Sequence, residues 1–271
     1  LKADYIIDCS AEPAVEISKK KTVKVIESNF LSTVNILQKV KKDNSKLIFI
    51  SSSRVYPITE SYKKFKRYKK LGKHLPYKEE SNFNDTKTIY GFTKYCSEHL
   101  IKEYNYSENT KFIINRCGLI SGPGQYGKVE QGLVALWMWR HINKMKVTYL
   151  GHGGNGNQVR DVLFIKDLCK LILIQIKQFK KFENEIFCIG GGTKNAINLK
   201  NLTKLCQNIT KNKIKIMKNL NTSIYDIPYY VTSINKINKI SNWKPRINLS
   251  QGLLEIYNWM ILNKKKIKKF F

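Results

Sequence analysis

Short apolar runs alternate with longer amphipathic stretches along this chain. The apolar runs have the length of strands and are rich in β-branched and aromatic residues, and they lie at 5–8, 46–50, 111–116, 147–150, 185–189 and 213–217. The longer stretches repeat apolar residues at a helical spacing, at 18–40, from Tyr90 onward, and at 130–142, 165–177, 199–210 and 250–262. Strands that alternate with helices are typical of parallel βαβ units. We therefore predict an α/β fold with a doubly wound, Rossmann-like parallel sheet and a smaller carboxy-terminal α/β domain.

Three hydroxyl groups follow the strand predicted at 46–50. They belong to Ser51, Ser52 and Ser53. In parallel sheets the chemistry collects at the carboxyl ends of the strands, where a hydroxyl can bind a substrate oxygen. The same three serines could also begin an ordinary loop, so they need a second observation beside them.

Tyr90 and Lys94 supply that observation. A helix that begins near Tyr90 places the two side chains one turn apart on the same face. A nearby ammonium favours the phenolate, so Tyr90 is a candidate base for removing a proton from an alcohol. The chain has one other pair with this spacing, Tyr62 and Lys66, in the polar run YKKFKRYKK. We interpret that second pair as part of a solvated loop.

Several sequence blocks, in this order along the chain, resemble the extended short-chain dehydrogenase/reductase family, which includes the NAD-dependent sugar-nucleotide epimerases. The blocks are NFLSTVNIL, SSSRVYP, YGFTKYCSEHL, NRCGLISGPGQYGKVEQGLVALW, GNGNQVRDVLFIKDL and FCIGGG. RCGLISGPGQYGKVEQG and GNGNQVRDVL are most similar to the CDP-paratose 2-epimerase type within this family. The resemblance implies NAD as cofactor and a nucleotide-linked sugar as substrate.

The family's motifs assign roles to individual positions. The resemblance implies that Ser52, Tyr90 and Lys94 are catalytic, with Lys94 also lowering the pKa of Tyr90. The positions it implies for cofactor binding are Cys9, Ser10, Ala11, Asn29, Ser51, Tyr90, Lys94, Cys117 and Gly118. It implies substrate contacts for Ser53, Arg54, Gln131 and Arg160, with Gln131 and Arg160 at the diphosphate; it implies no metal site.

Two places near the expected substrate site differ from the family's motifs, and a third residue there is expected to have a structural role. Leu119 stands where many relatives have asparagine, and Asn221-Thr-Ser-Ile-Tyr-Asp stands where many have a second phosphate-binding arginine. Asp161 follows Arg160, and we expect it to anchor its loop.

The implied reaction is epimerisation through a transient keto sugar in carbohydrate biosynthesis, most closely at carbon 2 of a CDP-linked dideoxyhexose. A 4-epimerase acting on a UDP- or dTDP-sugar, or a reductase of the family, stays open. A 4,6-dehydratase is disfavoured because Ser53 and Arg54 stand where that reaction has Asp and Glu. A different class of function, a catalytically inactive binding module, stays open as well.

The amino-terminal segment bears on that last alternative. The segment 1–8 is interpreted as the end of a helix followed by a strand, with no glycine-rich turn before it. We expect an amino-terminal truncation that removes the first strands and leaves this chain inactive alone. The one GxGxxG string, Gly151–Gly156, leads into an extended run and not a helix, so it does not match a dinucleotide site.

The resemblance and the element order together predict the domains. A partial NAD-binding domain is expected at 1–118 and about 159–189, and a substrate-binding domain at 119–158 and 190–271. The segment 57–87 is long, basic and aromatic, and predicts either a flap over the sugar or a surface insertion. The basic run 264–269 predicts a frayed, solvated end.

Composition changes this picture little. The formal net charge of the 271 residues is +29, yet only six of the 49 basic residues are arginine. Nucleic-acid readers favour arginine, so we expect no nucleic-acid partner. The six cysteines form no C-x-x-C pair, and no apolar run is long enough to span a membrane. We expect reduced, mostly buried thiols in a cytoplasmic homodimer or higher homo-oligomer that does not bind membranes.

Overall fold

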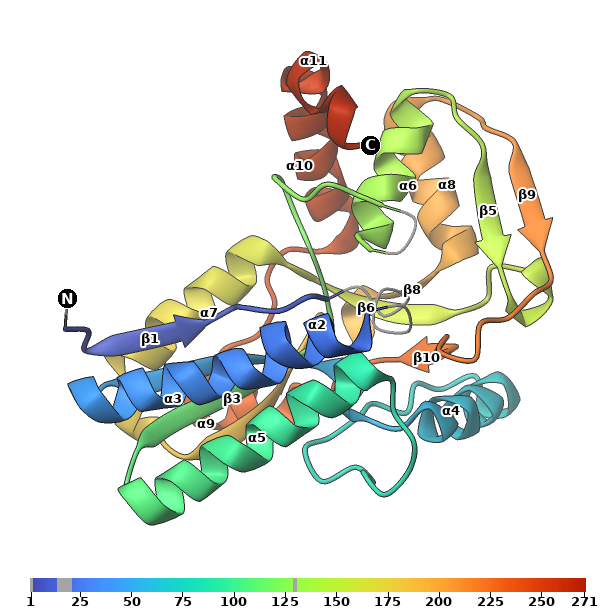
Figure 1. The fold of residues 1–271 in the computed structure, drawn as a ribbon. Helices are drawn as coiled ribbons and strands as arrows, with labels where there is room; N and C mark the ends of the chain where they lie inside the picture. The colour runs from blue at the N-terminus through green and yellow to red at the C-terminus, as the bar shows by residue number, and fades with distance from the viewer. Residues whose placement is uncertain (1, 14–20, 129–130) are drawn as a thin grey trace.

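The computed structural model of the protein describes residues 2–13, 21–128 and 131–271. A parallel sheet forms its centre (Figure 1), with strand order β1-β2-β3-β7. The strands are β1 (Tyr5–Asp8), β2 (Lys46–Ser52), β3 (Lys111–Cys117) and β7 (Glu185–Ile189). Both faces are covered by helices, so the strands can be apolar on both sides. The predicted α/β fold with a parallel sheet is confirmed.

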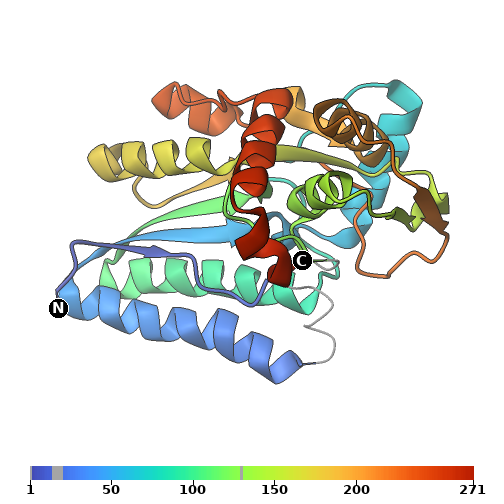
Figure 2. The ribbon, with the colours of Figure 1, turned by 90° about the horizontal axis from the view of Figure 1, so that it is seen from above.

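Helices cover the sheet in two layers (Figure 2). One layer holds α2 (Thr22–Ile26), a π-helical turn (Glu27–Leu31), α3 (Ser32–Asp43) and α5 (Ile89–Glu108). The other holds α7 (Ile165–Lys177) and α9 (Asn235–Ser241). Apolar side chains of α3, α5 and the strands form one buried cluster, and those of α7, α9 and the strands form another.

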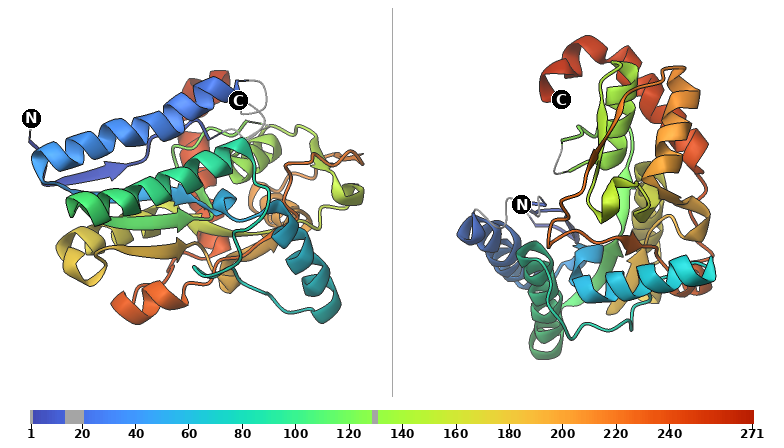
Figure 3. Two further views of the ribbon diagram at one scale, coloured as in Figure 1. Left: turned by 60° about the horizontal axis from the view of Figure 1, so that its bottom comes forward. Right: turned by 90° about the vertical axis from the view of Figure 1, so that its right-hand side faces the viewer.

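The remaining elements lie together beyond the carboxyl ends of the central strands (Figure 3). β4 (Leu119–Ser121), β6 (Val159–Phe164) and β10 (Tyr229–Tyr230) are parallel, and β8 (Ala196–Asn198) pairs antiparallel with β6. β5 (Val147–Leu150) pairs with β9 (Ile216–Asn219). A third apolar cluster joins α6 (Leu133–Ile142), α8 (Leu199–Thr210) and α10 (Leu249–Leu262). The division of the chain into two domains stays a prediction.

The segment 57–87 is more ordered than its sequence indicated. Ile58–Leu71 forms α4, so the prediction that Tyr62 and Lys66 lie in a loop is wrong. Ser61 and Phe65 are buried on one face of this helix, and Ser61 Oγ donates a hydrogen bond to Tyr229 O at 2.7 Å. Packing against β10 therefore stabilises a helix whose exposed side chains are mostly basic.

The rest of that segment returns along the same side of the molecule. Tyr77 forms a β-bridge with Thr232 and stacks on Tyr230, with 4.8 Å between ring centroids. Phe83 stacks on Tyr56 at 5.0 Å. None of residues 57–87 lines either of the two cavities described below. The segment packs against other parts of the fold and does not cover a cavity as a flap would.

The basic carboxy-terminal run is also folded. α11 (Lys264–Ile267) buries Ile267, and the Phe271 ring stacks on Trp139 with 4.6 Å between centroids. The expectation of a frayed end is wrong because aromatic residues beyond the lysines pack against α6.

Smaller differences concern element ends and thiols. β9 begins three residues later than the predicted strand at 213–217, and residues 2–4 are not helical. Parts of the expected helices at 18–40 and 130–142, namely 18–20 and Glu130, lie outside the described residues, as does Leu1. All six cysteines are free, but Cys9 and Cys169 are exposed. Among the described helices, none combines the length and apolar character that a membrane span requires.

Candidate active site

A cavity of about 290 Å³ lies at the carboxyl ends of β1, β2 and β3, beside the first turns of α5. It brings together most of the positions predicted from the sequence. Its lining residues are Cys9, Ala11, Pro13, Ile50, Ser51, Ser52, Tyr90, Lys94, Cys117, Gly118, Ile120 and Gln131. The strand ends meet there because β2 and β3 are in register, with Ser52 opposite Cys117.

The start of α5 places Tyr90 and Lys94 in this cavity. Thr88 caps the helix, and its side chain accepts a hydrogen bond from Gly91 N at 2.9 Å. Gly91 touches the backbone of Arg54 so closely that a Cβ atom would lie 2.1 Å from the Arg54 carbonyl oxygen. Glycine at this position therefore lets α5 approach the end of β2, which carries Ser52.

Burial and three polar neighbours determine the acidity of Tyr90. Burial raises the pKa of the phenol above its ordinary value; a hydrogen bond with Ser52 and the charge of Arg54 oppose this shift in part, and Cys117 adds to it. Lys94 is not among the groups that shift this pKa, which corrects the prediction that its ammonium acidifies Tyr90. The cation that acts on the phenol is Arg54, from the short 3-10 turn Ser53–Val55.

Lys94 points elsewhere. Its side chain is 2% exposed, and Nζ donates a hydrogen bond to Ser10 O at 3.2 Å and lies 4.3 Å from the centre of the Phe49 ring. Burial lowers the pKa of the ammonium, although Asp8 opposes that shift. The amine thus faces the end of β1, where Cys9 and Ala11 line the cavity.

Ser51 and Asn29 support the cavity from behind. Ser51 lines it, but its hydroxyl donates a hydrogen bond to Glu98 Oε1 at 2.5 Å. Asn29 is fully buried; its Oδ1 accepts from Glu12 N at 2.7 Å, and its Nδ2 donates to Thr93 Oγ1 at 3.2 Å. Asn29 therefore joins the segment after β1 to α5.

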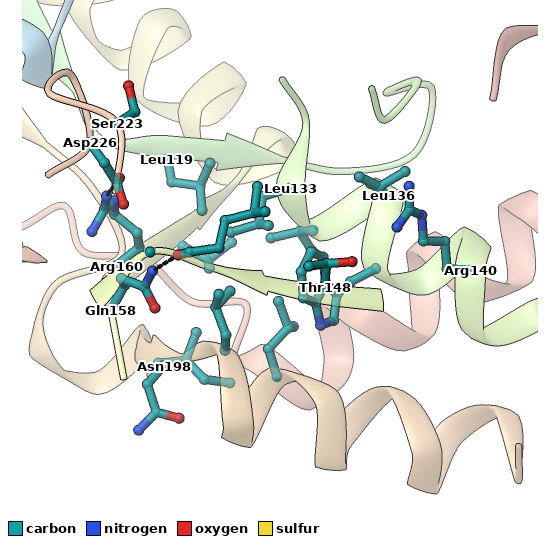
Figure 4. A pocket seen from close by; sticks show the side chains of 18 of the residues that line it. Leu119, Leu133, Leu136, Arg140, Thr148, Gln158, Arg160, Asn198, Ser223 and Asp226 are labelled. Atoms are coloured by element: carbon teal, nitrogen blue, oxygen red, sulfur yellow. Dashed lines mark hydrogen bonds and ion pairs between the residues drawn. The ribbon is translucent and has the colours of Figure 1, made fainter. Parts of the chain in front are cut away.

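A second cavity, of about 780 Å³, lies between β6, α6, α8 and the loop before β10 (Figure 4). Its walls are largely apolar, made by Leu119, Leu133, Val134, Leu136, Trp137, Val162, Ile197, Leu199 and Leu202. Arg160 and Asp226 lie at one end and Arg140 at the other (Figure 4). Gly118 lines the smaller cavity and Leu119 the larger, so the two cavities are neighbours along the chain.

Arg160 is held at its end of the larger cavity by several acceptors. Its guanidinium donates to Val159 O at 2.8 Å and to Ile227 O, and it pairs with Asp226 Oδ1 at 3.6 Å. Arg54 lines the same cavity and donates to Tyr225 O at 2.8 Å. Three arginines from distant parts of the chain, Arg54, Arg140 and Arg160, therefore line one cavity.

Asp226 is a residue that the sequence analysis missed. Burial raises the pKa of its carboxyl, but hydrogen bonding with His152 and the charge of Arg160 outweigh burial and lower it. His152 Nε2 lies 3.0 Å from Asp226 Oδ2. Nothing in the spacing of these residues along the chain could have paired them.

Other predicted contacts are more dispersed. Gln131 is exposed and lines the smaller cavity, so the structure does not place it beside Arg160. Ser53 lines neither cavity. Asp161 is fully buried and accepts hydrogen bonds from Gly192 N at 2.9 Å and Thr232 N at 3.1 Å, which agrees with an anchoring role. Burial raises the pKa of this carboxyl to about 6.

Comparison with known proteins places this geometry in a family. Residues 1–190 match the NAD dependent epimerase/dehydratase family. The chain belongs to this family. A Salmonella typhi protein named CDP-paratose 2-epimerase is 28% identical over 244 residues, which cover 86% of this chain and 70% of the relative. A putative UDP-glucose 4-epimerase of Methanocaldococcus jannaschii is 28% identical, covering 97% of this chain and 78% of the relative.

Solved structures show the same fold. A Thermotoga maritima UDP-glucose 4-epimerase with UDP-glucose has a TM-score of 0.79 at 23% identity, over 96% of this chain and 78% of that one. A Bacillus cereus UDP-glucuronic acid 4-epimerase in complex with UDP-glucuronic acid and NAD has a TM-score of 0.81 at 21% identity, over 96% and 76%.

NAD is the cofactor of this family, and the residues around the smaller cavity suit it. Within the described residues, Lys94 has one hydrogen-bond acceptor, Ser10 O, so its ammonium keeps donors for hydroxyl groups. Asp8 Oδ2 at the end of β1 is buried and has no hydrogen-bond partner among the described residues. A ribose hydroxyl can satisfy such an acceptor, because buried polar atoms are rarely left unpaired.

Proposed function

We propose that this protein epimerises a nucleotide-linked sugar by transient oxidation, with a substrate of the CDP-paratose 2-epimerase type. The observation that carries the proposal is the meeting of Ser52, Tyr90 and Lys94 in one cavity at the strand ends. The neighbouring cavity of about 780 Å³ has the size of a site for a nucleotide, with arginines to bind phosphates.

In this proposal Tyr90, as phenolate, accepts the proton of a sugar hydroxyl, and Ser52 hydrogen-bonds the same oxygen. Arg54 favours the phenolate by its charge, and Lys94 holds ribose hydroxyls of the cofactor. NAD, when bound, would supply the acceptor for the hydride of the oxidised carbon and the donor that returns it. Arg54 and Arg160 hold the diphosphate in the larger cavity, which would leave the flat keto sugar free to present its other face.

Relatives of this chain support the CDP-sugar and also provide a second candidate. The Salmonella typhi relative is named CDP-paratose 2-epimerase. The Methanocaldococcus jannaschii relative and a Thermodesulfobacterium geofontis relative are named as UDP-sugar 4-epimerases. A 4-epimerase uses the same serine and tyrosine, so the geometry of the smaller cavity suits both reactions.

The test is turnover on a panel of substrates. The full-length protein encoded by the gene is incubated with NAD and CDP-, UDP- or dTDP-linked sugars, and NMR of the anomeric protons follows the products. We expect a new epimer from a CDP-linked dideoxyhexose. An epimer from UDP-sugars alone would establish the second candidate, and binding without conversion of any sugar would indicate an inactive binding module.

A further inference from the structure

A buried ion pair connects α5 to the ends of two central strands. Glu98 lies one helical turn beyond Lys94 and is 1% exposed. Arg116 on β3 donates from Nη2 to Glu98 Oε2 at 2.7 Å, and from Nε to both carboxylate oxygens at 3.1 Å. Ser51 at the end of β2 donates to Glu98 Oε1 at 2.5 Å. One carboxylate therefore joins α5, β2 and β3.

Each partner in this connection is a chain neighbour of a residue in the smaller cavity. Ser51 precedes Ser52, and Arg116 precedes Cys117. Ser51 and Arg116 are also opposite each other in the register of β2 and β3. If the Glu98 carboxylate moved, Ser51 and Arg116 would move with it, and so would Ser52 and Cys117, which follow them directly in the chain.

Arg116 is immobilised from its other side. Its Nη1 donates to Glu79 O at 2.9 Å and to Tyr56 Oη at 3.3 Å. The guanidinium carbon lies 4.4 Å from the centre of the Phe83 ring. These contacts come from the insertion 57–87 and from the chain just before it, so the insertion fixes the arginine that holds Glu98.

Stability alone is a poor explanation for this arrangement. Replacing a buried ion pair by apolar residues of similar size is often neutral or stabilising, because charges lose hydration on burial. A forked arginine–carboxylate contact does provide a defined geometry. Here that geometry relates α5, which carries Tyr90, to the strand end that carries Ser52.

We propose that Glu98 is a positioning residue that keeps Tyr90 within hydrogen-bonding reach of Ser52 by binding Ser51 and Arg116. The inference rests on the proposed role of Tyr90 as the base. The groups that act on the Tyr90 phenol are Ser52, Arg54 and Cys117. All three lie on or just after β2 and β3, the strands that Glu98 joins to α5.

Ser51→Ala tests the proposal with little change in volume, and Ser97→Ala is its matched control. Ser97 is a fully buried hydroxyl on α5, and it bonds Thr33 at 3.0 Å and Asn29 O at 3.2 Å, away from β2 and β3. 3,5-Difluorotyrosine is introduced at position 90 in each protein, and its phenol is titrated by ¹⁹F NMR without cofactor or sugar. Thermal melting checks that each variant folds.

We expect Ser51→Ala to raise the pKa of the fluorinated phenol by about 1, the value of one hydrogen bond, while Ser97→Ala leaves it unchanged. Ser51→Thr, which keeps the hydroxyl, should restore the original pKa. If Ser51→Ala does not fold, Glu98→Asp, which shortens the reach of the carboxylate, should shift the pKa in the same direction.

Equal shifts in the alanine variants, or no shift in folded Ser51→Ala or Glu98→Asp, would overturn the proposal. The titration is independent of turnover. Its failure therefore contradicts the positioning role alone, whereas a protein that converts no nucleotide sugar contradicts the proposed function and leaves the titration valid.

Discussion

The two cavities are built by different means. The smaller one is formed by strand ends and the first turns of α5, and its polar side chains are held by partners such as the buried Glu98 carboxylate and the backbone oxygen of Ser10. The larger one has mainly apolar walls from helices and strands far apart in the chain, with arginines at its ends. Reaction chemistry needs a few groups at defined distances, whereas nucleotide binding needs area and a counter-charge. We therefore expect substitutions in the two cavities to affect different steps.

The largest effect is expected from Tyr90→Phe. Loss of a general base should reduce turnover by about 10²- to 10⁴-fold, because the proton of the sugar hydroxyl then has no acceptor. Isothermal titration should give an unchanged Kd for the nucleotide sugar. Tyr62→Phe is the control, since this tyrosine belongs to the other pair with the same spacing and lines neither cavity. Equal turnover in both variants would remove Tyr90 from the mechanism.

A smaller effect, on nucleotide affinity, is expected from Arg160→Lys in the larger cavity. An ammonium cannot reproduce the forked contact, so the Kd of the nucleoside diphosphate should rise about 10- to 100-fold, the value of a hydrogen bond to a charged group. Turnover at saturating substrate should change little. Arg246→Lys, at an exposed arginine outside both cavities, should leave the Kd unchanged. If Arg160→Lys lowers saturated turnover at an unchanged Kd, the two cavities are not functionally separate.

The smallest effect concerns Asp161, whose carboxylate accepts hydrogen bonds from Gly192 N and Thr232 N. Its pKa of about 6 in the fold exceeds the ordinary value of 3.8, so the folded protein binds more protons between these limits. Stability contributed by this group is therefore present at low pH and lost as the pH rises through 6. The loss should be at most about 3 kcal/mol, or roughly 6–12 °C in Tm.

Asp161→Asn removes the titration of this carboxyl group and leaves those of all other groups in place. The variant keeps an oxygen that can accept from Gly192 N and Thr232 N, so its Tm should fall less than that of the parent between pH 5 and 7.5. Asp85→Asn is the control, because side-chain hydrogen bonding from Thr59 lowers the pKa of Asp85 and its titration lies below this range. Parallel Tm curves for the parent and Asp161→Asn would show that Asp161 does not titrate in this interval.

The smaller cavity was accessible to sequence reasoning for a physical reason. Parallel strands end at one edge, and helical spacing places Tyr90 and Lys94 on one face, so two local rules bring Ser52 near Tyr90. The sequence block YGFTKYCSEHL also contains Glu98, four residues after Lys94, so helical spacing could have placed it one turn beyond Lys94 on the same face. The detailed electrostatics were not: Arg54, and not Lys94, is the cation that lowers the Tyr90 pKa.

The larger cavity shows the limit of such rules. Asp226 meets Arg160 and His152 only because the loop before β10 folds back beside β6. The insertion 57–87 shows the same limit, since its helix depends on burying Ser61 and Phe65 against β10. Contacts between residues so far apart leave no periodic trace in either segment.

The sequence by itself determined the alternation of strands and helices, the strand-end serines and the tyrosine and lysine of α5, because periodicity and turn chemistry are local properties. Only the tertiary structure decided which cation faces Tyr90, which acid faces Arg160 and what holds α5 against β2 and β3. Those pairings depend on how elements pack, and packing selects among many side-chain partners that the order of residues leaves open.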